Sequence, residues 1–178
     1  MIRSKADLKE YLRRDMGMYH ALSPKDRLVC RILNDPLYQI TRYLRYLRKE
    51  EYHFNSRHLL RSVWMLRRKN TIGNRLGFKI PRNCIGPGLT IYHHGQVIVN
   101  EGARIGADCQ LHGGNCIGNN GVTQAVPVIG DGLDLGIGAC IIGDVKLGNQ
   151  VKVGANAVVT RSVEQDAVTL VGIPARVK

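Results

Sequence analysis

The chain has 178 residues, enough for one domain or two small ones, and 26 Lys and Arg against 14 Asp and Glu give it a formal net charge of +12. A chain of this length buries roughly two-thirds of its unfolded surface, so it needs neither disulfides nor a structural metal to fold. No apolar run approaches the length of a membrane span, and no apolar segment follows the basic residues between Met1 and Arg14, so neither a membrane helix nor a secretory signal is expected.

The positive charge is concentrated in the first half of the chain. Residues 1–82 hold 20 Lys and Arg against 7 Asp and Glu, whereas residues 83–178 hold 6 against 7. Arg42, Arg45 and Lys49 recur at helical spacing, which predicts one basic helix face. This face is either a solvated surface or a contact for an anionic partner. No aromatic side chains alternate with the basic ones, so nucleic acid is not expected, while peripheral contact with an anionic membrane stays open.

Helices are predicted over most of residues 1–69. Residues 4–16 carry apolar side chains on one side of a helix. Three signals predict the starts of the later helices: Ser23-Pro24, Asp35-Pro36 and Ser56. The polar stretch 70–75 reads as a linker. We therefore expect a basic helical domain over residues 1–75.

Aliphatic residues in the second half recur at a strict step of six. The first row is Ile129, Leu135, Ile141, Leu147, Val153 and Val159, and a second row four residues on is Leu133, Ala139, Val145, Val151, Ala157 and Val163. A helix repeats at about 3.6 residues and a flat strand at about 2, so neither produces this period. A triangular coil with six residues a side does, provided that successive coils cover one another. The pattern predicts a parallel β-helix and, with the helices, an α+β fold.

The lattice extends back to Ile85 and is interrupted once. Residues 118–127 are polar and rich in Gly and Asn, which predicts a loop that leaves the coil there. Insertions in repeat proteins collect on the functional face, so this loop is a candidate part of a site. From Val163 the period ends, and Pro174 is suited to closing the stack because it cannot donate a further strand hydrogen bond. We expect a β-helical domain over residues 76–178.

The cysteines and glycines have structural explanations. Five cysteines show neither a CxxC motif nor metal-ligand spacing, and four fall within the lattice: Cys84, Cys109, Cys116 and Cys140. They are expected to be core thiols in a reducing cytoplasm, and no metal is expected. The Gly130-x-Gly132 and Gly136-x-Gly138 pairs resemble fragments of a phosphate-binding loop, but the lattice explains them as corner residues.

The candidates for chemistry are histidines. His93, His94 and His112 fall within the coils, and we expect a catalytic residue among them. Adjacent residues on a strand point to opposite faces, so either His93 or His94 faces a given cleft, not both.

The segment Gly86–Gly106 (GPGLTIYHHGQVIVNEGARIG) resembles the active-site coil of serine O-acetyltransferases, which are hexapeptide-repeat acyltransferases. The resemblance runs from about Gly86 to Ile117 and again from Pro127 to Arg176, roughly half of the chain. It implies a left-handed parallel β-helix after the helices, acetyl-CoA as co-substrate, and a homotrimer or a dimer of trimers with sites between subunits.

The resemblance also assigns site residues. His93 falls on the catalytic histidine, which acts as general base toward the acceptor hydroxyl. Asp35 is a loose match to a substrate-binding aspartate, with a helix N-cap as the alternative, and His112 is a further candidate for contacting the acceptor. The residues expected to bind acetyl-CoA are Gly136, Ile137, Gly154 and Ala155 along the pantetheine arm, and Lys152 and Arg176 at the phosphates.

Two positions depart from the serine acetyltransferase pattern. The carboxylate partner of the catalytic histidine falls on Phe78, and a second histidine that helps to hold serine falls on Val126. The expected function is O-acetyl transfer to L-serine or to a sugar hydroxyl, and these departures favour the sugar. The alternative is a non-catalytic β-helical scaffold that docks on an anionic partner through its basic helices.

Overall fold

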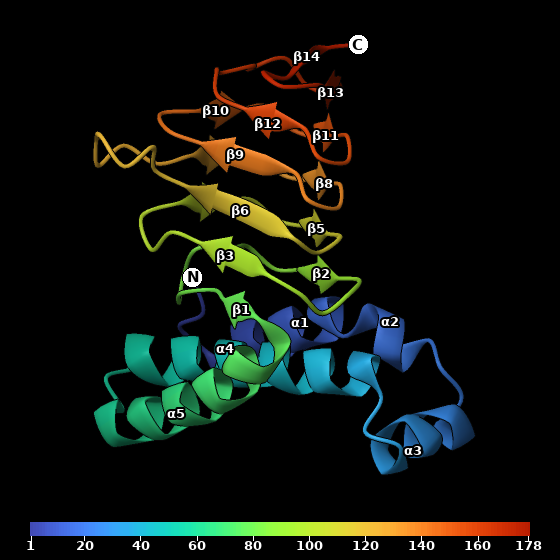
Figure 1. Cartoon of the computed structure of the whole chain (residues 1–178). Helices are drawn as coiled ribbons and strands as arrows, with labels where there is room; N and C mark the ends of the chain where they lie inside the picture. Colours follow the sequence, from blue (N-terminus) through green and yellow to red (C-terminus); the bar gives the residue numbers. More distant parts are fainter.

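The computed structural model describes all residues 1–178 and shows a helical base from which a stack of coils rises (Figure 1). The helices are α1 (Lys5–Asp15), α2 (Gly17–His20), α3 (Pro24–Ile32), α4 (Pro36–Asn55) and α5 (Leu59–Leu76). The longest two, α4 and α5, pack along each other beneath the coils. None of the helices is both long and apolar enough to cross a bilayer.

Two of the three predicted caps begin a helix. Ser23 caps α3 and Asp35 caps α4, each with a proline in the first turn. The prediction for Ser56 was wrong, because this residue ends α4 and α5 begins after His58. The left-handed backbone of Arg57 (φ 60°) separates the two helices.

The predicted linker at residues 70–75 was also wrong, because α5 continues to Leu76. Its last turns are held by packing: Ile72 and Gly73 are buried, and a Cβ on Gly73 would lie 2.9 Å from the Tyr43 ring. The helix then ends at Gly77, whose φ of 79° is easily adopted only by glycine.

Fourteen strands form three sheets, which we call A, B and C. Sheet A holds β1 (Phe78–Lys79), β3 (Val97–Val99), β6 (Asn115–Gly118), β9 (Cys140–Ile142) and β12 (Val158–Val159). Sheet B holds β4 (Arg104–Ile105), β7 (Val128–Ile129) and β10 (Lys146–Leu147). Sheet C holds β2 (Thr90–Ile91), β5 (Gln110–Leu111), β8 (Asp134–Leu135), β11 (Lys152–Val153), β13 (Thr169–Val171) and β14 (Arg176–Val177).

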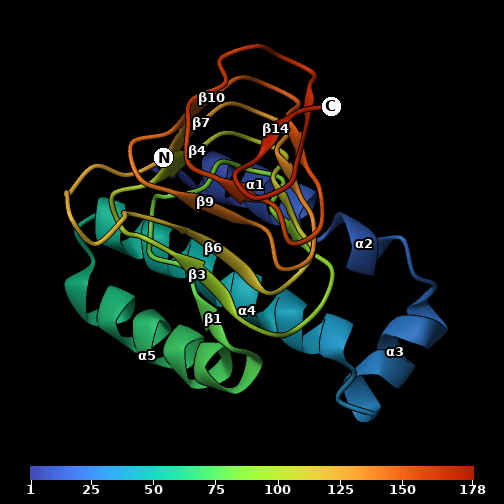
Figure 2. The same cartoon turned by 45° about the horizontal axis from the view of Figure 1, so that its top comes forward.

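From β2 to β12 the chain visits sheets C, A and B in turn, and each strand pairs in parallel with the strand three places later. This order is that of a β-helix with triangular coils, as Figure 2 shows from its end. The six-residue rows lie inside: Leu147 pairs with Ile129 and Val153 with Leu135, and all four are buried. The predicted α+β fold and its stacked apolar columns are confirmed. At the end of the stack, β14 pairs antiparallel with β13.

The predicted interruption lies between β6 and β7, where the ribbon leaves the stack in Figure 1. The Asn120 carboxamide oxygen accepts hydrogen bonds from the backbone N–H groups of Val122 (3.0 Å) and Thr123 (2.9 Å), which closes a turn within the loop. The loop leaves the edge between sheets A and B.

A buried ion cluster joins the helical base to the first coil. Arg48 on α4 is fully buried and lies 2.6 Å from Asp15 and 3.0 Å from Glu51. Its guanidinium also donates to the carbonyl oxygens of Ile85 (2.9 Å) and Gly86 (2.7 Å). The basic helical half is therefore not only a solvated surface, because one of its arginines is a core residue of the junction.

Candidate active site

His93 lies two residues after the end of β2, at the edge where the chain turns from sheet C into sheet A. Its side chain is exposed and takes part in no hydrogen bond or ion pair with the rest of the chain. The neighbouring coil carries Gly113 beside it, where a Cβ would lie 3.7 Å from the His93 Cβ. The imidazole is thus accessible to a bound substrate, and the coil above it leaves room.

The position of the missing carboxylate belongs to the core. Phe78 on β1 is 6% exposed, and its ring meets the Tyr43 ring edge-on with 5.2 Å between centroids. Phe78 therefore anchors the first coil to α4 and offers His93 no hydrogen bond. Val126, at the end of the loop, is half-buried beside Gly102.

A polar cluster lies on the outer face of sheet C next to His93. The His112 ring stacks on the Tyr92 ring with 4.5 Å between centroids. The His112 Nε2 atom lies 2.9 Å from Asp134 Oδ1, and the Tyr92 hydroxyl donates to Gln110 Oε1 at 2.7 Å. Because Tyr92 precedes His93, the cluster forms one side of the edge on which His93 lies.

Of this cluster, sequence reasoning found only His112. The step along sheet C is 20 residues from Thr90 to Gln110, 24 from Gln110 to Asp134 and 18 from Asp134 to Lys152. The long step contains the loop, so the pairing of Asp134 with its neighbours could be found only by assigning the whole loop to that coil.

Four predicted acetyl-CoA contacts share an edge with His93: Gly136 and Ile137 after β8, and Gly154 and Ala155 after β11. Since β2, β5, β8 and β11 pair in order, the residues that follow them stack above one another. Above His93 the edge carries Gly113, then Ile137, which is 55% exposed, and then Ala155, which is exposed. Parallel strands are about 4.8 Å apart, so Ala155 lies about 14 Å along the edge from His93. We call this strip the C–A edge.

Gly136 and Gly154, two of the predicted acetyl-CoA contacts, are also needed for the packing of one coil on the next. A Cβ on Gly136 would lie 2.8 Å from the backbone nitrogen of Ala155, and one on Gly154 would lie 3.1 Å from a methyl group of Val171. Their lack of a side chain is required for coil packing, whatever binds outside. Substitution of either glycine by a larger residue would therefore disturb coil packing and would not report on ligand binding.

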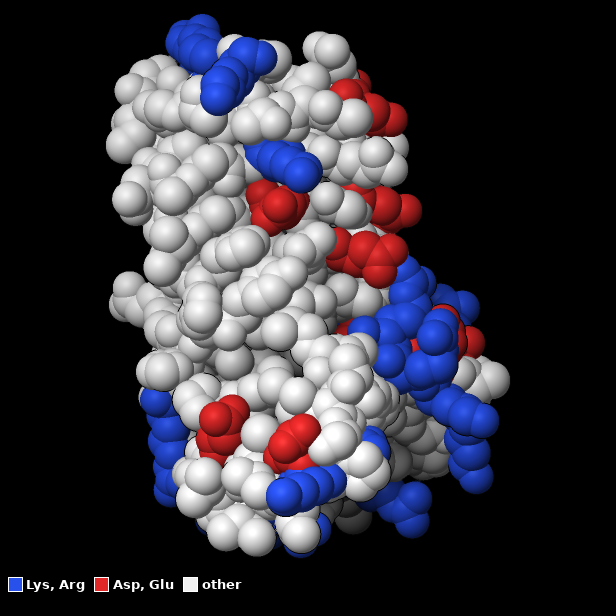
Figure 3. All heavy atoms as spheres, turned by 90° about the vertical axis from the view of Figure 1, so that its right-hand side faces the viewer, with Lys and Arg blue, Asp and Glu red and all other residues white.

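The remaining predicted residues lie apart from His93. Lys152 on β11 and Arg176 on β14 are exposed near the coil end furthest from the helices. Figure 3 shows Lys and Arg at that end and a larger group over the helical base. Asp35 accepts a hydrogen bond from the backbone N–H of Leu37 at 2.8 Å, as an N-cap does, and it contacts neither His93 nor His112 through a hydrogen bond or ion pair.

The three basic residues of α4 differ in their surroundings. Arg45 is exposed, whereas Arg42 and Lys49 are half-buried. The Arg42 guanidinium lies 5.7 Å from the centre of the Tyr38 ring, so part of its surface is covered within the helix. An anionic surface would meet mainly Arg45.

The four cysteines of the coils divide into two pairs. Cys84 and Cys109 are buried, and burial raises their thiol pKa to about 11 and about 12, so both remain protonated core residues as predicted. The prediction of core positions was wrong for Cys116 and Cys140, which pair across β6 and β9 on the outer face of sheet A and are half-buried. No three His, Cys, Asp or Glu side chains are grouped so as to hold a metal ion.

Apart from the exposed Lys79 on β1, which pairs with Ile98, the outer face of sheet A is apolar. It presents Ile98, Cys116, Cys140, Ile142 and Val158, with Ile98 38% exposed. By contrast, sheet B presents Arg104 and Lys146 among its outward residues. The apolar face borders the C–A edge and therefore His93.

No family model matches the chain, but curated relatives do. It is 35% identical over 99 residues to the serine acetyltransferase of Mycobacterium tuberculosis. The matched region covers 54% of this chain and 43% of that protein. It is 38% identical over 135 residues to WcaB of Escherichia coli K12, which is named as a putative colanic acid biosynthesis acetyltransferase. The matched region covers 66% of this chain and 82% of that protein. The chain thus spans less than half of the mycobacterial relative and most of WcaB.

Solved structures agree with the fold. The soybean serine acetyltransferase apoenzyme matches with a TM-score of 0.78 and 28% identity, over 98% of this chain and 70% of that one. A serine acetyltransferase in complex with CoA matches with a TM-score of 0.74 and 25% identity, over 98% and 71%. The architecture is N-terminal helices followed by the left-handed parallel β-helix of these proteins. On these grounds the chain belongs to the serine O-acetyltransferase-like hexapeptide-repeat acyltransferases.

Proposed function

We propose that the protein transfers the acetyl group of acetyl-CoA to a hydroxyl group of a glycan unit, with His93 as general base. The neutral imidazole takes the proton of the acceptor hydroxyl as that oxygen attacks the thioester carbonyl. The C–S bond then breaks, CoA leaves as the thiol with that proton, and an acetyl ester remains on the acceptor. The observation that carries this proposal is the exposed imidazole at the start of the C–A edge.

Acetyl-CoA is assigned to the C–A edge. A related structure is a complex with CoA, and here the residues that stack above His93 are Gly113, Ile137 and Ala155, of which none carries a charged side chain. Lys152 and Arg176, toward the far end of the stack, are then the candidates for its phosphates. Use of acetyl-CoA and the presence of five free cysteines favour a cytoplasmic location.

We assign the apolar face of sheet A to subunit contacts in a homotrimer, or in a dimer of trimers. An apolar face of this kind is typical of an interface, and here it borders His93. A neighbouring subunit seated on it would form the second wall of the site. That wall would also supply the group that orients His93, which has no partner in its own chain.

The acceptor is inferred from groups that the site lacks. Free serine carries a carboxylate and an ammonium, and each needs a partner. The chain has Val126 and Phe78 where serine acetyltransferases have a histidine and a carboxylate, and each lost charged hydrogen bond costs about 1.5–3 kcal/mol. WcaB, of which the chain covers most, is not named for serine, which also favours a different acceptor.

The test is thiol release from acetyl-CoA with L-serine and with a panel of monosaccharides and oligosaccharides as acceptors. We expect at least one saccharide to be acetylated faster than serine. A kcat/KM for serine above about 10⁴ M⁻¹s⁻¹, the lower edge of ordinary enzyme efficiency, would refute the glycan assignment. Absence of turnover with every acceptor, together with binding to anionic vesicles, would favour the scaffold alternative.

A further inference from the structure

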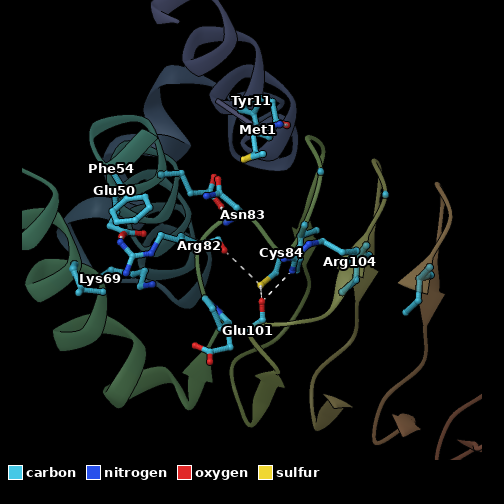
Figure 4. Close-up of a pocket in the computed structure, with 18 of the residues that line it drawn as sticks. Met1, Tyr11, Glu50, Phe54, Lys69, Arg82, Asn83, Cys84, Glu101 and Arg104 are labelled. Carbon is cyan, nitrogen blue, oxygen red and sulfur yellow. Dashed lines mark hydrogen bonds and ion pairs between the residues drawn. The ribbon is translucent and has the colours of Figure 1, made fainter. Parts of the chain in front are cut away.

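A cavity of about 790 Å³ lies between the helical base and sheet B, away from His93. Its walls come from α1, α4, α5, β4, β7 and the segment that leads into the first coil. Figure 4 shows Glu50, Phe54 and Lys69 on the helical side and Arg104 on the side of the coils. Because β4 and β7 belong to sheet B and His93 lies between sheets C and A, the cavity is separate from the candidate active site.

Glu50 is the unusual residue of this cavity. Its side chain is 1% exposed, and neither carboxylate oxygen accepts a well-aligned hydrogen bond, although the Ser62 hydroxyl is a neighbouring donor. Arg82 Nη1 lies 2.9 Å from Glu50 Oε1, so the two form an ion pair without the alignment of a hydrogen bond. Buried carboxylates are normally satisfied by donors, so this one is poised to accept from a ligand.

The surroundings of Glu50 select against a cationic donor. Lys69 is 5% exposed, lines the same cavity and donates to the carbonyl oxygen of Ile80 at 3.1 Å. Arg82 lies with its guanidinium 3.8 Å from the centre of the Phe54 ring. An ammonium or guanidinium ligand bound to Glu50 would lie near both of these positive charges and be repelled by them. The favoured donor is therefore neutral, such as a hydroxyl group.

The opposite wall adds donors and apolar surface. Arg104 is exposed, and only its Nη1 atom donates within the protein, to the carbonyl oxygens of Glu101 (3.0 Å) and Ala103 (2.8 Å). Its other nitrogens remain available to a ligand oxygen. Next to it the cavity is lined by Ile85, Ile105 and Ile129, which suit C–H groups.

We propose that this cavity binds a neutral saccharide unit, with one hydroxyl group that donates to Glu50 and another, toward the opposite wall, that accepts from Arg104. A pyranose ring combines such hydroxyls with apolar C–H faces, and the volume lies within the range of ordinary ligand pockets. The proposal does not depend on acetyl transfer, because binding here can be measured without acetyl-CoA.

The test is saturation-transfer difference NMR on the full-length protein without acetyl-CoA, using methyl glycosides of glucose, galactose, fucose and N-acetylglucosamine. We expect saturable binding of at least one glycoside by the wild type. Glu50→Gln and Arg104→Ala should each weaken it about tenfold, while Arg75→Ala, an exposed arginine on α5 outside the cavity, should not. Arg104 is exposed, so its variant decides the outcome if the buried Glu50 variant fails to fold.

Three results would overturn the proposal. Absence of saturable glycoside binding by the wild type would mean that the cavity holds only water. Preferential binding of spermidine would show that Glu50 selects a cation. Binding that survives Arg104→Ala but is lost in His93→Ala would place the saccharide at the C–A edge.

Discussion

The guanidinium Nε of Arg48 lies 2.6 Å from the carboxylate of Asp15, and both side chains are completely buried where the helices meet the first coil. The second Asp15 oxygen accepts from the backbone N–H groups of Gly88 (2.7 Å) and Leu89 (3.0 Å). The pair therefore joins α1, α4 and the coil that leads to His93. Breaking this ion pair should lower the free energy of unfolding and loosen the coil that positions His93.

Arg48→Met should lower the free energy of unfolding by about 3–5 kcal/mol, because it leaves the Asp15 charge buried without its partner. Urea unfolding followed by circular dichroism measures this. Arg45→Met, at an exposed position on the same helix, is the matched control and should change stability by less than about 0.5 kcal/mol. Equal effects of the two variants would show that the buried pair does not hold the junction.

The buried Glu50 carboxyl predicts that the free energy of unfolding depends on pH. Burial raises its pKa above the ordinary 4.5, although Lys69 and Arg82 oppose this shift. A raised pKa means that the folded state binds the proton more tightly, so the contribution to stability is fully present below pH 4.5 and is lost as pH rises through the raised pKa. The unfolding free energy of the wild type minus that of Glu50→Gln should therefore fall from acid to neutral pH. A difference that grows with pH would mean that the folded protein favours the carboxylate.

The apolar outer face of sheet A predicts how the chain assembles. Ile98→Arg should dissociate the proposed trimer and abolish activity, because it places a charge in the proposed interface. Lys146→Glu, an exposed change on sheet B, should leave the assembly intact. Light scattering distinguishes the two. A wild-type chain that is monomeric and active at micromolar concentration would contradict the shared site.

The C–A edge predicts the position of acetyl-CoA. Ala155→Trp should raise KM for acetyl-CoA about tenfold or more with little change in kcat, because it obstructs binding without touching the base. The control is Arg161→Trp, because Arg161 is exposed and lies just after β12, where the chain leaves sheet A on the side away from the C–A edge. Steady-state kinetics in which both variants match the wild type would remove acetyl-CoA from this edge.

The sequence predicted the coils better than it predicted their surroundings. Leu135, Ile141 and Val153 lie inside as the six-residue step requires, because this period is set by the geometry of each coil. Residues 70–75 were mistaken for a linker, since their helical state depends on packing of Gly73 against Tyr43. The burial of Arg48 was equally hidden, because its partner Asp15 lies on another helix.

Only part of the candidate site could be predicted from the sequence. The period alone could not choose between His93 and His94, and the resemblance to serine acetyltransferases made that choice. The partnership of His112 with Asp134 depends on the sheet register across the loop, which no local pattern reports. The cavity around Glu50 depends on how the helices meet sheet B, which the sequence does not show.

The most direct test of the account compares His93→Ala with His94→Ala in acetyl-CoA thiol release with the best acceptor. Both side chains are exposed, so neither change should disturb the fold, the assembly or acetyl-CoA binding. His93→Ala should lower kcat by about 10²–10⁴, the usual contribution of a general base, while His94→Ala should retain most activity. Equal losses, or a larger loss for His94→Ala, would contradict the assignment of His93 as the base.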